Sequence, residues 1–244
     1  MRRFPAILVF LAASFSVVGC SHAHVQPMYP LDSSLERKRI TEAYLNTLGI
    51  PINPHLPSIE GENKVRLREP KEVAKRAAVL YALVAVAHGV DRRRTSEWLR
   101  KEGLWESVSP KEKEFFDSEK PSDQNRIDVS WRAESLWALL WAMGKIEKLD
   151  LPNAECDTQL IQDVMPEPET MVAHFVNQAT LRPPSEILDA MDLTYRIDWA
   201  VVDARMNRRE APGGVNPGIV YERHYALNWL TWYADGWDDI TTDT

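Results

Sequence analysis

The sequence lacks the signals of β-structure. It has no run of alternating β-branched residues, and no Asn-Gly or Asp-Gly pair flanked by such runs. Apolar residues instead recur at the spacing of amphipathic helices through most of the chain. We therefore expect an all-α fold: a single multi-helix, bundle-like globular domain over residues 32–244, with short capping helices and Pro-rich loops.

Basic charge and catalytic motifs are also scarce. The chain has 29 Lys and Arg against 36 Asp and Glu, a formal net charge of -7, and no basic stripe that could neutralise phosphates. A nucleic-acid partner is therefore not expected. Because the sequence has no G-x-S-x-G elbow and no H-E-x-x-H motif, no catalytic residue can be named, and we expect no metal or cofactor.

The chain has two cysteines, Cys20 and Cys156, so it can form at most one disulfide. The leader sequence indicates that Cys20 carries a lipid, which leaves Cys156 without a partner and the chain without an intrachain disulfide. Cys156 lies in a loop-like acidic segment, residues 152–157, whose negative charges should raise the pKa of its thiol. We interpret it as a structural cysteine rather than a nucleophile.

The first residues have the pattern of a signal peptide, with Arg2 and Arg3 before an apolar stretch at residues 7–15. That stretch is shorter than the about 20 residues that span a bilayer. The segment Val-Val-Gly-Cys at residues 17–20 resembles the bacterial lipobox, which implies removal of residues 1–19, acylation of Cys20 and a lipidated tether over residues 20–31. Ordinary cleavage after residue 23 and an uncleaved anchor helix are the alternatives.

The residue after Cys20 is serine rather than the aspartate that retains lipoproteins in the inner membrane. By resemblance to the sorting rule of bacteria with two membranes, the expected location is the periplasmic face of the outer membrane. The expected membrane partner is thus reached through the lipid on Cys20.

Helix periodicity and helix start and stop signals divide the domain. They predict helices over residues 32–48, 70–87, 96–101, 110–116, 122–149, 169–179, 184–209 and 217–234. Ser109 and Asn216 should cap helices that begin with proline. The helix at 70–87 is apolar almost all round and should be central and buried. Gly144 should weaken the helix at 122–149 by about 1 kcal/mol relative to alanine.

Residues 67–73 and 181–187 share the pattern L-R-x-P-x-E-(V/I). Duplication of a helical half of the domain would produce this similarity. Two ordinary helix starts, with proline at the first position and a glutamate near the positive end of the helix dipole, would produce it as well. We favour two helix starts, because a repeat architecture should show a sustained period.

Charged residues interrupt aromatic-rich sequence in several segments, and arginines and carboxylates beside large aromatics should be partly buried and therefore paired. They form a candidate pocket or buried polar network: Arg132, Glu134, Asp192, Arg196, Asp198, Trp199, Glu222, Arg223, His224, Asn228, Trp237 and Asp238. The first interpretation is an interhelical network of salt bridges and hydrogen bonds that fixes the register of the helices.

Three further interpretations remain open. A metal site is possible because one helical stripe, which Glu134, Glu222 and His224 could face, carries Asp189, Asp192, Trp199 and Asp203. A hydrolase could use Glu222 or Asp238 as base and His224 as acid. A recognition pocket would have Arg196 and Arg223 as anchors and an aromatic lining of Trp199, Tyr225, Trp229, Trp232 and Trp237.

Several of these segments carry a resemblance to a known family. They are residues 68–80, S-W-R-A-E at 130–134, E-I-L-D at 186–189, Asp192, Y-R at 195–196, W-A at 199–200, Y-E-R-H-Y-A-L-N-W-L at 221–230 and W-D-D-I-T-T-D-T at 237–244. Together they resemble the uncharacterised bacterial family called domain of unknown function 4272, over about residues 35–244. The resemblance implies a helical domain without an established activity, so no catalytic residue carries over. Most members are cytosolic, whereas this chain has a lipobox.

These observations favour a periplasm-facing binding or protein-interaction module with an unidentified protein or small-molecule partner. The alternative is a hydrolase or metal-binding enzyme that uses acidic residues and His224 in a helical pocket. An enzyme should place its carboxylates in a concave pocket, whereas a structural network should satisfy every charge internally.

Overall fold

A computed structural model describes residues 34–119, 121–166 and 171–244. These residues form helices and no strand, which confirms the predicted all-α fold. The described residues belong to one compact unit. None of the helices described is long and apolar enough to cross a membrane. The predicted signal peptide, Cys20 and the tether lie outside the described residues.

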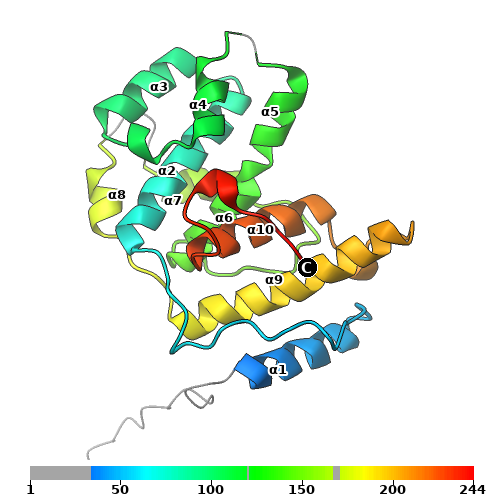
Figure 1. The fold of residues 1–244 in the computed structure, drawn as a ribbon. Helices are drawn as coiled ribbons and strands as arrows, with labels where there is room; N and C mark the ends of the chain where they lie inside the picture. The colour runs from blue at the N-terminus through cyan, green and yellow to red at the C-terminus, as the bar shows by residue number, and fades with distance from the viewer. Residues whose placement is uncertain (1–33, 120, 167–170) are drawn as a thin grey trace, which may run out of the picture. The chain divides into compact units, whose positions relative to one another are not determined.

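The helices follow one another along the chain, and long loops without a helix lie at residues 48–69 and 143–157 (Figure 1). The α-helices are α1 Ser34–Thr47, α2 Pro70–Ala87, α3 Arg92–Lys101, α4 Pro110–Asp117, α5 Asp123–Ser130, α6 Arg132–Ala142, α7 Thr158–Val164, α8 Ala173–Asn177, α9 Pro184–Met206 and α10 Pro217–Leu230. Three short 3-10 helices are η1 Trp105–Ser107, η2 Pro212–Gly214 and η3 Trp237–Asp239.

The predicted helix starts at Ser109 and Asn216 are confirmed. The side chain of Ser109 accepts a hydrogen bond from the backbone of Glu112, and that of Asn216 accepts one from Gly218. In both helices a proline follows at the first helical position, where no backbone N–H is needed.

The prediction of one helix over residues 122–149 is wrong. The chain forms α5 and α6, which meet at Trp131, where the Ser130 hydroxyl donates to the carbonyl of Ile127 and the N–H of Glu134 bonds the carbonyl of Trp131. These bonds to residues three positions back tighten the helix locally. The second helix ends at Ala142 because Gly144, with a φ of 71°, adopts the left-handed conformation that terminates helices.

Of two other predicted helices, the one at 217–234 ends earlier in the structure and the one at 169–179 is described only in part. The final helix ends at Leu230 rather than at residue 234, because Trp232 adopts a φ of 59°. Of the helix predicted over 169–179, the structure describes α8, and residues 167–170 lie outside the described part.

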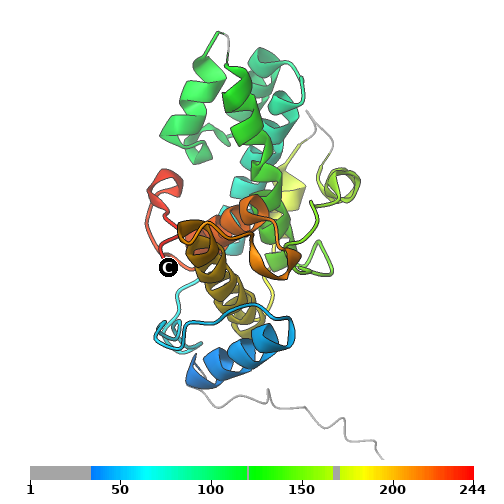
Figure 2. The same ribbon diagram turned by 90° about the vertical axis from the view of Figure 1, so that its right-hand side faces the viewer.

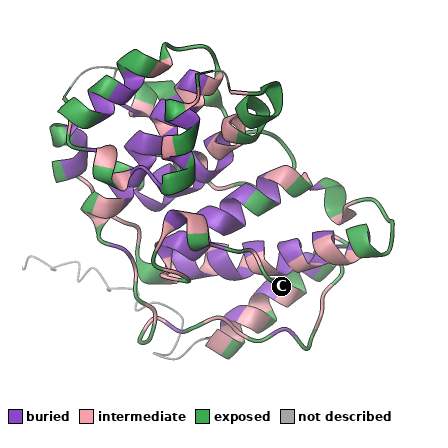
Figure 3. Ribbon diagram, turned by 45° about the horizontal axis from the view of Figure 1, so that its top comes forward, coloured by how far each residue is buried: buried purple, intermediate pink, exposed green. Residues whose placement is uncertain are grey.

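The central contact is that of α6 with α10, which is the most extensive between any two described helices. α2 packs on α6, α9 packs on α10, and α1 packs on α9. In two perpendicular views, α1 and α9 lie at one end and α3, α4 and α5 at the other (Figures 1 and 2). Buried residues gather where these helices face one another (Figure 3).

Two hydrophobic clusters result from this packing. The larger one joins α2, α6 and α10, and it includes Leu80, Leu136 and Leu227, each fully buried. The prediction that the helix from Pro70 is a buried central helix is therefore confirmed. The smaller cluster joins α1, α9 and the start of α10 around Leu45 and Ile197.

The sequence pattern that residues 67–73 and 181–187 share is matched by equivalent contacts. Arg68 precedes α2, and its Nε donates to the carbonyl of Trp229 at the end of α10 at 2.7 Å. Arg182 precedes α9, and its Nε donates to the carbonyl of Trp141 at the end of α6 at 2.7 Å. Each guanidinium also binds carbonyls five and six residues beyond that tryptophan, and the glutamate four residues after the arginine.

The helices that these arginines cap are themselves related. Residues 134–141 of α6 and 222–229 of α10 share the pattern E-x-x-(W/Y)-A-L-x-W. Three positions after each final tryptophan the backbone takes a positive φ, at Gly144 and at Trp232. Residues 67–73 and 181–187 are helix starts, as expected, but they also belong to two related halves, α2 with α6 and α9 with α10. The arginine of each half caps the second helix of the other.

We predict that Arg68→Met and Arg182→Met each lower the free energy of unfolding by about 2–3 kcal/mol, because several carbonyls at a helix end lose their donor. Urea unfolding of each variant measures this loss. The matched control is Arg39→Met, whose exposed ion pair with Glu36 should contribute nothing measurable. Losses no larger than that of the control would contradict the capping role.

Candidate functional site

The sequence candidates meet first at the contact between α6 and α10. Nε and Nη2 of Arg223 donate to Oε2 of Glu134 at 3.1 and 3.0 Å, and both side chains are at most 5% exposed. The other oxygen of Glu134 accepts from the backbone N–H of Cys156 at 2.6 Å. Nη1 of Arg223 donates to the carbonyl of Asp150 at 2.7 Å. The pair therefore ties α6 and α10 to the loop at residues 143–157.

Glu222 occupies the position in α10 that Glu134 occupies in α6. Its Oε2 accepts from the Ser135 hydroxyl at 2.6 Å and from Nη1 of Arg132 at 3.1 Å. Each helix thus contributes a glutamate that is bound by residues of the other. Burial raises the pKa of Glu222, although Arg132 and the Ser135 hydroxyl act in the opposite direction.

A second group of candidates lies on α9. Arg196 donates to both carboxylate oxygens of Asp192, at 3.0 and 2.8 Å, and both residues are buried. One turn and a half further, Oδ2 of Asp198 lies 2.9 Å from Nδ1 of His224, again with both residues buried. Trp199 packs half-buried against the smaller hydrophobic cluster.

The remaining candidates hold the C-terminal segment on α10. The side-chain amide of Asn228 donates to the carbonyl of Thr241 at 2.7 Å. The ring of Trp237 lies edge-on to Trp229, with centroids 5.5 Å apart. Asp238 accepts from the Ser109 hydroxyl at 2.7 Å and from the backbone N–H of Lys111 at 2.9 Å, so it binds the start of α4.

The structure does not bring the hydrolase candidates together. Glu222 binds Ser135 and Arg132, His224 binds Asp198, and Asp238 binds the start of α4. The proposed recognition aromatics are divided as well, because Trp199 belongs to the smaller cluster whereas Trp229 and Trp237 belong to the larger one.

The acidic stripe on α9 is bound by arginines. Asp189 pairs with Arg37 at 2.8 Å, and Asp203 pairs with Arg209 at 2.5 Å. Asp192 is the partner of Arg196, as described above. In the ranges that the structure describes, no group of three or more His, Cys, Asp and Glu side chains could hold a metal ion.

Cys156 is half-buried beside this network. Burial raises the pKa of its thiol well above the usual range, and the neighbouring Glu134 raises it further. Since the thiolate is the reactive form, this cysteine is a poor nucleophile at neutral pH.

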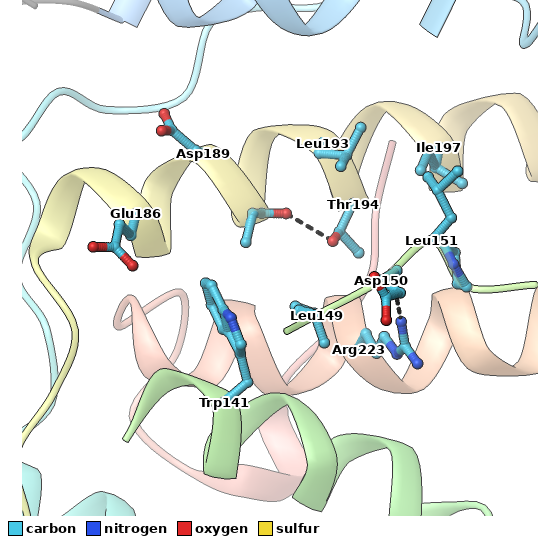
Figure 4. A pocket seen from close by; sticks show the side chains of 12 residues that line it. Trp141, Leu149, Asp150, Leu151, Glu186, Asp189, Leu193, Thr194, Ile197 and Arg223 are labelled. Carbon is cyan, nitrogen blue, oxygen red and sulfur yellow. Dashed lines mark hydrogen bonds between the residues drawn. The ribbon is translucent and has the colours of Figure 1, made fainter. Parts of the chain in front are cut away.

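A cleft of about 290 Å³, which we name the α9 cleft, opens beside Arg223. Figure 4 shows Trp141 and Thr194 facing it from different helices, with Arg223 and Asp150 at one end. Its lining is apolar at Trp141, Leu149, Leu151, Pro152, Ala190, Leu193 and Ile197 and polar at Asp150, Glu186, Asp189, Thr194 and Arg223.

The charged groups of the α9 cleft, apart from the exposed carboxylate of Asp150, already have partners. Glu186 pairs with Arg182 at 2.9 Å, and Asp189 pairs with Arg37. The Thr194 hydroxyl donates to the carbonyl of Ala190 at 2.7 Å. Burial raises the pKa of Asp189, against the opposite effect of Arg37. The cleft can therefore accept an apolar group and offer hydrogen bonds at its rim, but its paired carboxylates are poorly suited to move protons.

Sequence reasoning named Arg223 for the site and Asp189 for a metal stripe, but it missed the rest of the α9 cleft. Trp141 and Thr194 read as ordinary helix residues, because nothing local shows that α6 and α9 meet. The repeated Leu-Arg before a helix-starting proline was the available signal, since Arg182 fixes the end of α6 against the start of α9.

The comparisons with known proteins give one match. A family model described as Domain of unknown function (DUF4272) matches residues 37–240. Neither the curated proteins nor the solved structures contain a match.

The two equivalent glutamates should respond differently to removal of their charge. Glu134→Gln should lower the free energy of unfolding by about 3–5 kcal/mol at pH 7, because it leaves Arg223 buried without a counter-ion. Glu222→Gln should cost much less, since Arg132 is 25% exposed and keeps its contact with water.

The pH dependence gives a second measure. Folding raises the pKa of Glu222, so protonation of this carboxyl stabilises the folded chain. This contribution to the free energy of unfolding is complete at low pH and is lost as the pH rises through the pKa of the folded state. The stability of Glu222→Gln relative to the unmodified chain should therefore improve between pH 4 and pH 7. Urea unfolding at several pH values measures both effects, and equal losses for the two variants at every pH would refute this assignment.

Proposed function

The chain belongs to the DUF4272 family, and we propose that it is a lipid-anchored, periplasm-facing binding module whose α9 cleft receives an apolar side chain of a protein partner. The observation that carries the proposal is the combination of apolar walls with two carboxylates, Glu186 and Asp189, that are already paired with arginines. Such a cleft favours binding over chemistry.

The size and rim of the α9 cleft support a side chain as the occupant. At about 290 Å³ the cleft lies at the lower end of ligand pockets, which range over about 300–1,000 Å³. The carboxylate of Asp150, exposed at the rim, could accept a backbone N–H of the partner. An apolar residue presented by a peptide satisfies both features.

The hydrolase alternative has weaker support. Its candidate residues Glu222, Asp238 and His224 bind three separate sets of neighbours, and none of them lines the α9 cleft. A general acid and a general base must both reach the reacting group.

The proposed location in the cell rests on the leader sequence alone. The positive n-region, the short apolar stretch and the lipobox-like end at Cys20 support export and acylation. The serine after Cys20 supports transfer to the outer membrane.

The anchor predicts a labelling result. In cells fed an alkyne analogue of palmitate, the chain should become labelled and sediment with membranes, whereas Cys20→Ala should lose both properties. Cys156→Ala is the control and should stay labelled. Label on Cys20→Ala, or none on the unmodified chain, would rule out the lipid anchor.

The cleft predicts a binding result. N-acetyl-L-leucine N-methylamide, which presents an apolar side chain between two peptide groups, should shift the indole signal of Trp141 in NMR titrations of the purified chain. Ala190→Phe fills the cleft and should weaken this binding at least tenfold. Ala154→Phe, in an exposed loop, makes the same change outside the cleft and should bind normally. Equal affinities for the two variants would refute the site.

A further inference from the structure

A second cleft, of about 470 Å³, lies where the other half of the molecule repeats the α9 cleft. We name it the α2 cleft. Trp229 and Glu72 line it at the positions that Trp141 and Glu186 occupy in the α9 cleft. The duplication therefore places two related clefts at the ends of α10 and α6, each beside an arginine that caps the helix.

Two equivalent positions differ in chemistry between the clefts. Ala190 and Leu149 of the α9 cleft correspond to Arg76 and Trp237 in the α2 cleft. Arg76 is 3% exposed and Trp237 is 5% exposed, so each is buried as deeply as a core residue. The α2 cleft thus has buried N–H donors where the α9 cleft has aliphatic groups.

These donors are not fully used. Nη2 of Arg76 donates to both oxygens of Glu112, at 2.7 and 2.6 Å, and Nη1 donates to the carbonyl of Ser107 at 3.0 Å. Nε of Arg76 and Nε1 of Trp237 have no hydrogen-bond partner in the structure. The guanidinium carbon lies 4.6 Å from the centre of the Trp237 ring, so both free N–H groups belong to one small region. Unpaired buried donors are rare and indicate a missing acceptor.

The rim of the same cleft is acidic. Glu106, Asp235 and Asp239 are exposed and line the cleft, and the structure shows no ion pair for these three side chains. They outnumber the partly exposed Lys113, which also lines the cleft. A ligand with only a negative charge would be repelled there. The arrangement instead suits a molecule that has an acceptor oxygen at one end and a positive charge at the other.

We propose that the α2 cleft binds a small zwitterion of the amino-acid class. Its carboxylate accepts hydrogen bonds from Nε of Arg76 and Nε1 of Trp237, and its cationic group faces Glu106 and Asp239. This site is separate from the α9 cleft and does not depend on the function proposed for it.

Calorimetric titration of the purified full chain with three probes tests the ligand class. L-Lysine has a carboxylate and two ammonium groups, L-lysinamide lacks the carboxylate, and hexanoate lacks both amines. The proposal expects saturable binding of L-lysine, with the other two at least tenfold weaker. Absence of L-lysine binding, or equal affinity for L-lysine and L-lysinamide, would overturn it.

Substitutions test the position. Trp237→Phe removes the free N–H and keeps an aromatic ring, so it should weaken L-lysine binding at least tenfold. Trp141→Phe makes the same change in the α9 cleft and should leave the affinity unchanged. Asp239→Asn, at an exposed position where folding is not at risk, should weaken binding of L-lysine by removing a negative charge. Unchanged affinity in both Trp237→Phe and Asp239→Asn would overturn the assignment, even if L-lysine binds elsewhere.

Discussion

The reciprocal contact between α6 and α10 is the feature on which the rest of the structure depends. Each helix carries a buried glutamate at the same position, and each glutamate is bound by side chains of the other helix. Buried ion pairs add little net stability, but removal of one partner is costly, so such contacts enforce one register between the helices. Arg68 and Arg182 add a second pair of reciprocal contacts, because each precedes the first helix of one half and caps the second helix of the other half.

The two clefts follow from this arrangement. A cleft opens at each place where the capped tryptophan of one half meets the first helix of the other. Related backbones then carry different side chains: aliphatic residues at Ala190 and Leu149, and N–H donors at Arg76 and Trp237. The duplication supplies the positions, and the side chains that differ between the halves decide which ligand chemistry each cleft suits.

Local sequence signals predicted most of the helices but not their partners. Proline at the first position, with a capping residue before it, located the starts of α4 and α10 correctly. The break between α5 and α6 at Trp131 was not predicted, because the apolar periodicity of the sequence continues from one helix into the next. The aromatic-flanked charges Glu134, Arg223 and Asp192 are indeed buried, since burial follows from composition, whereas the choice of partner is set by contacts between distant segments. Arg68, Arg76 and Arg182 were not chosen as site candidates, because none of them has a large aromatic residue beside it in the sequence.

Native-state hydrogen exchange, resolved by residue, tests most directly the claim that the α6–α10 contact joins the two halves into one cooperative unit. The account predicts that the slowest amides lie in α6 and α10, around Leu139 and Leu227, and that both sets exchange with the free energy of global unfolding. If amides of α10 exchanged at a clearly lower free energy than those of α6, the halves would open separately and the account would be contradicted.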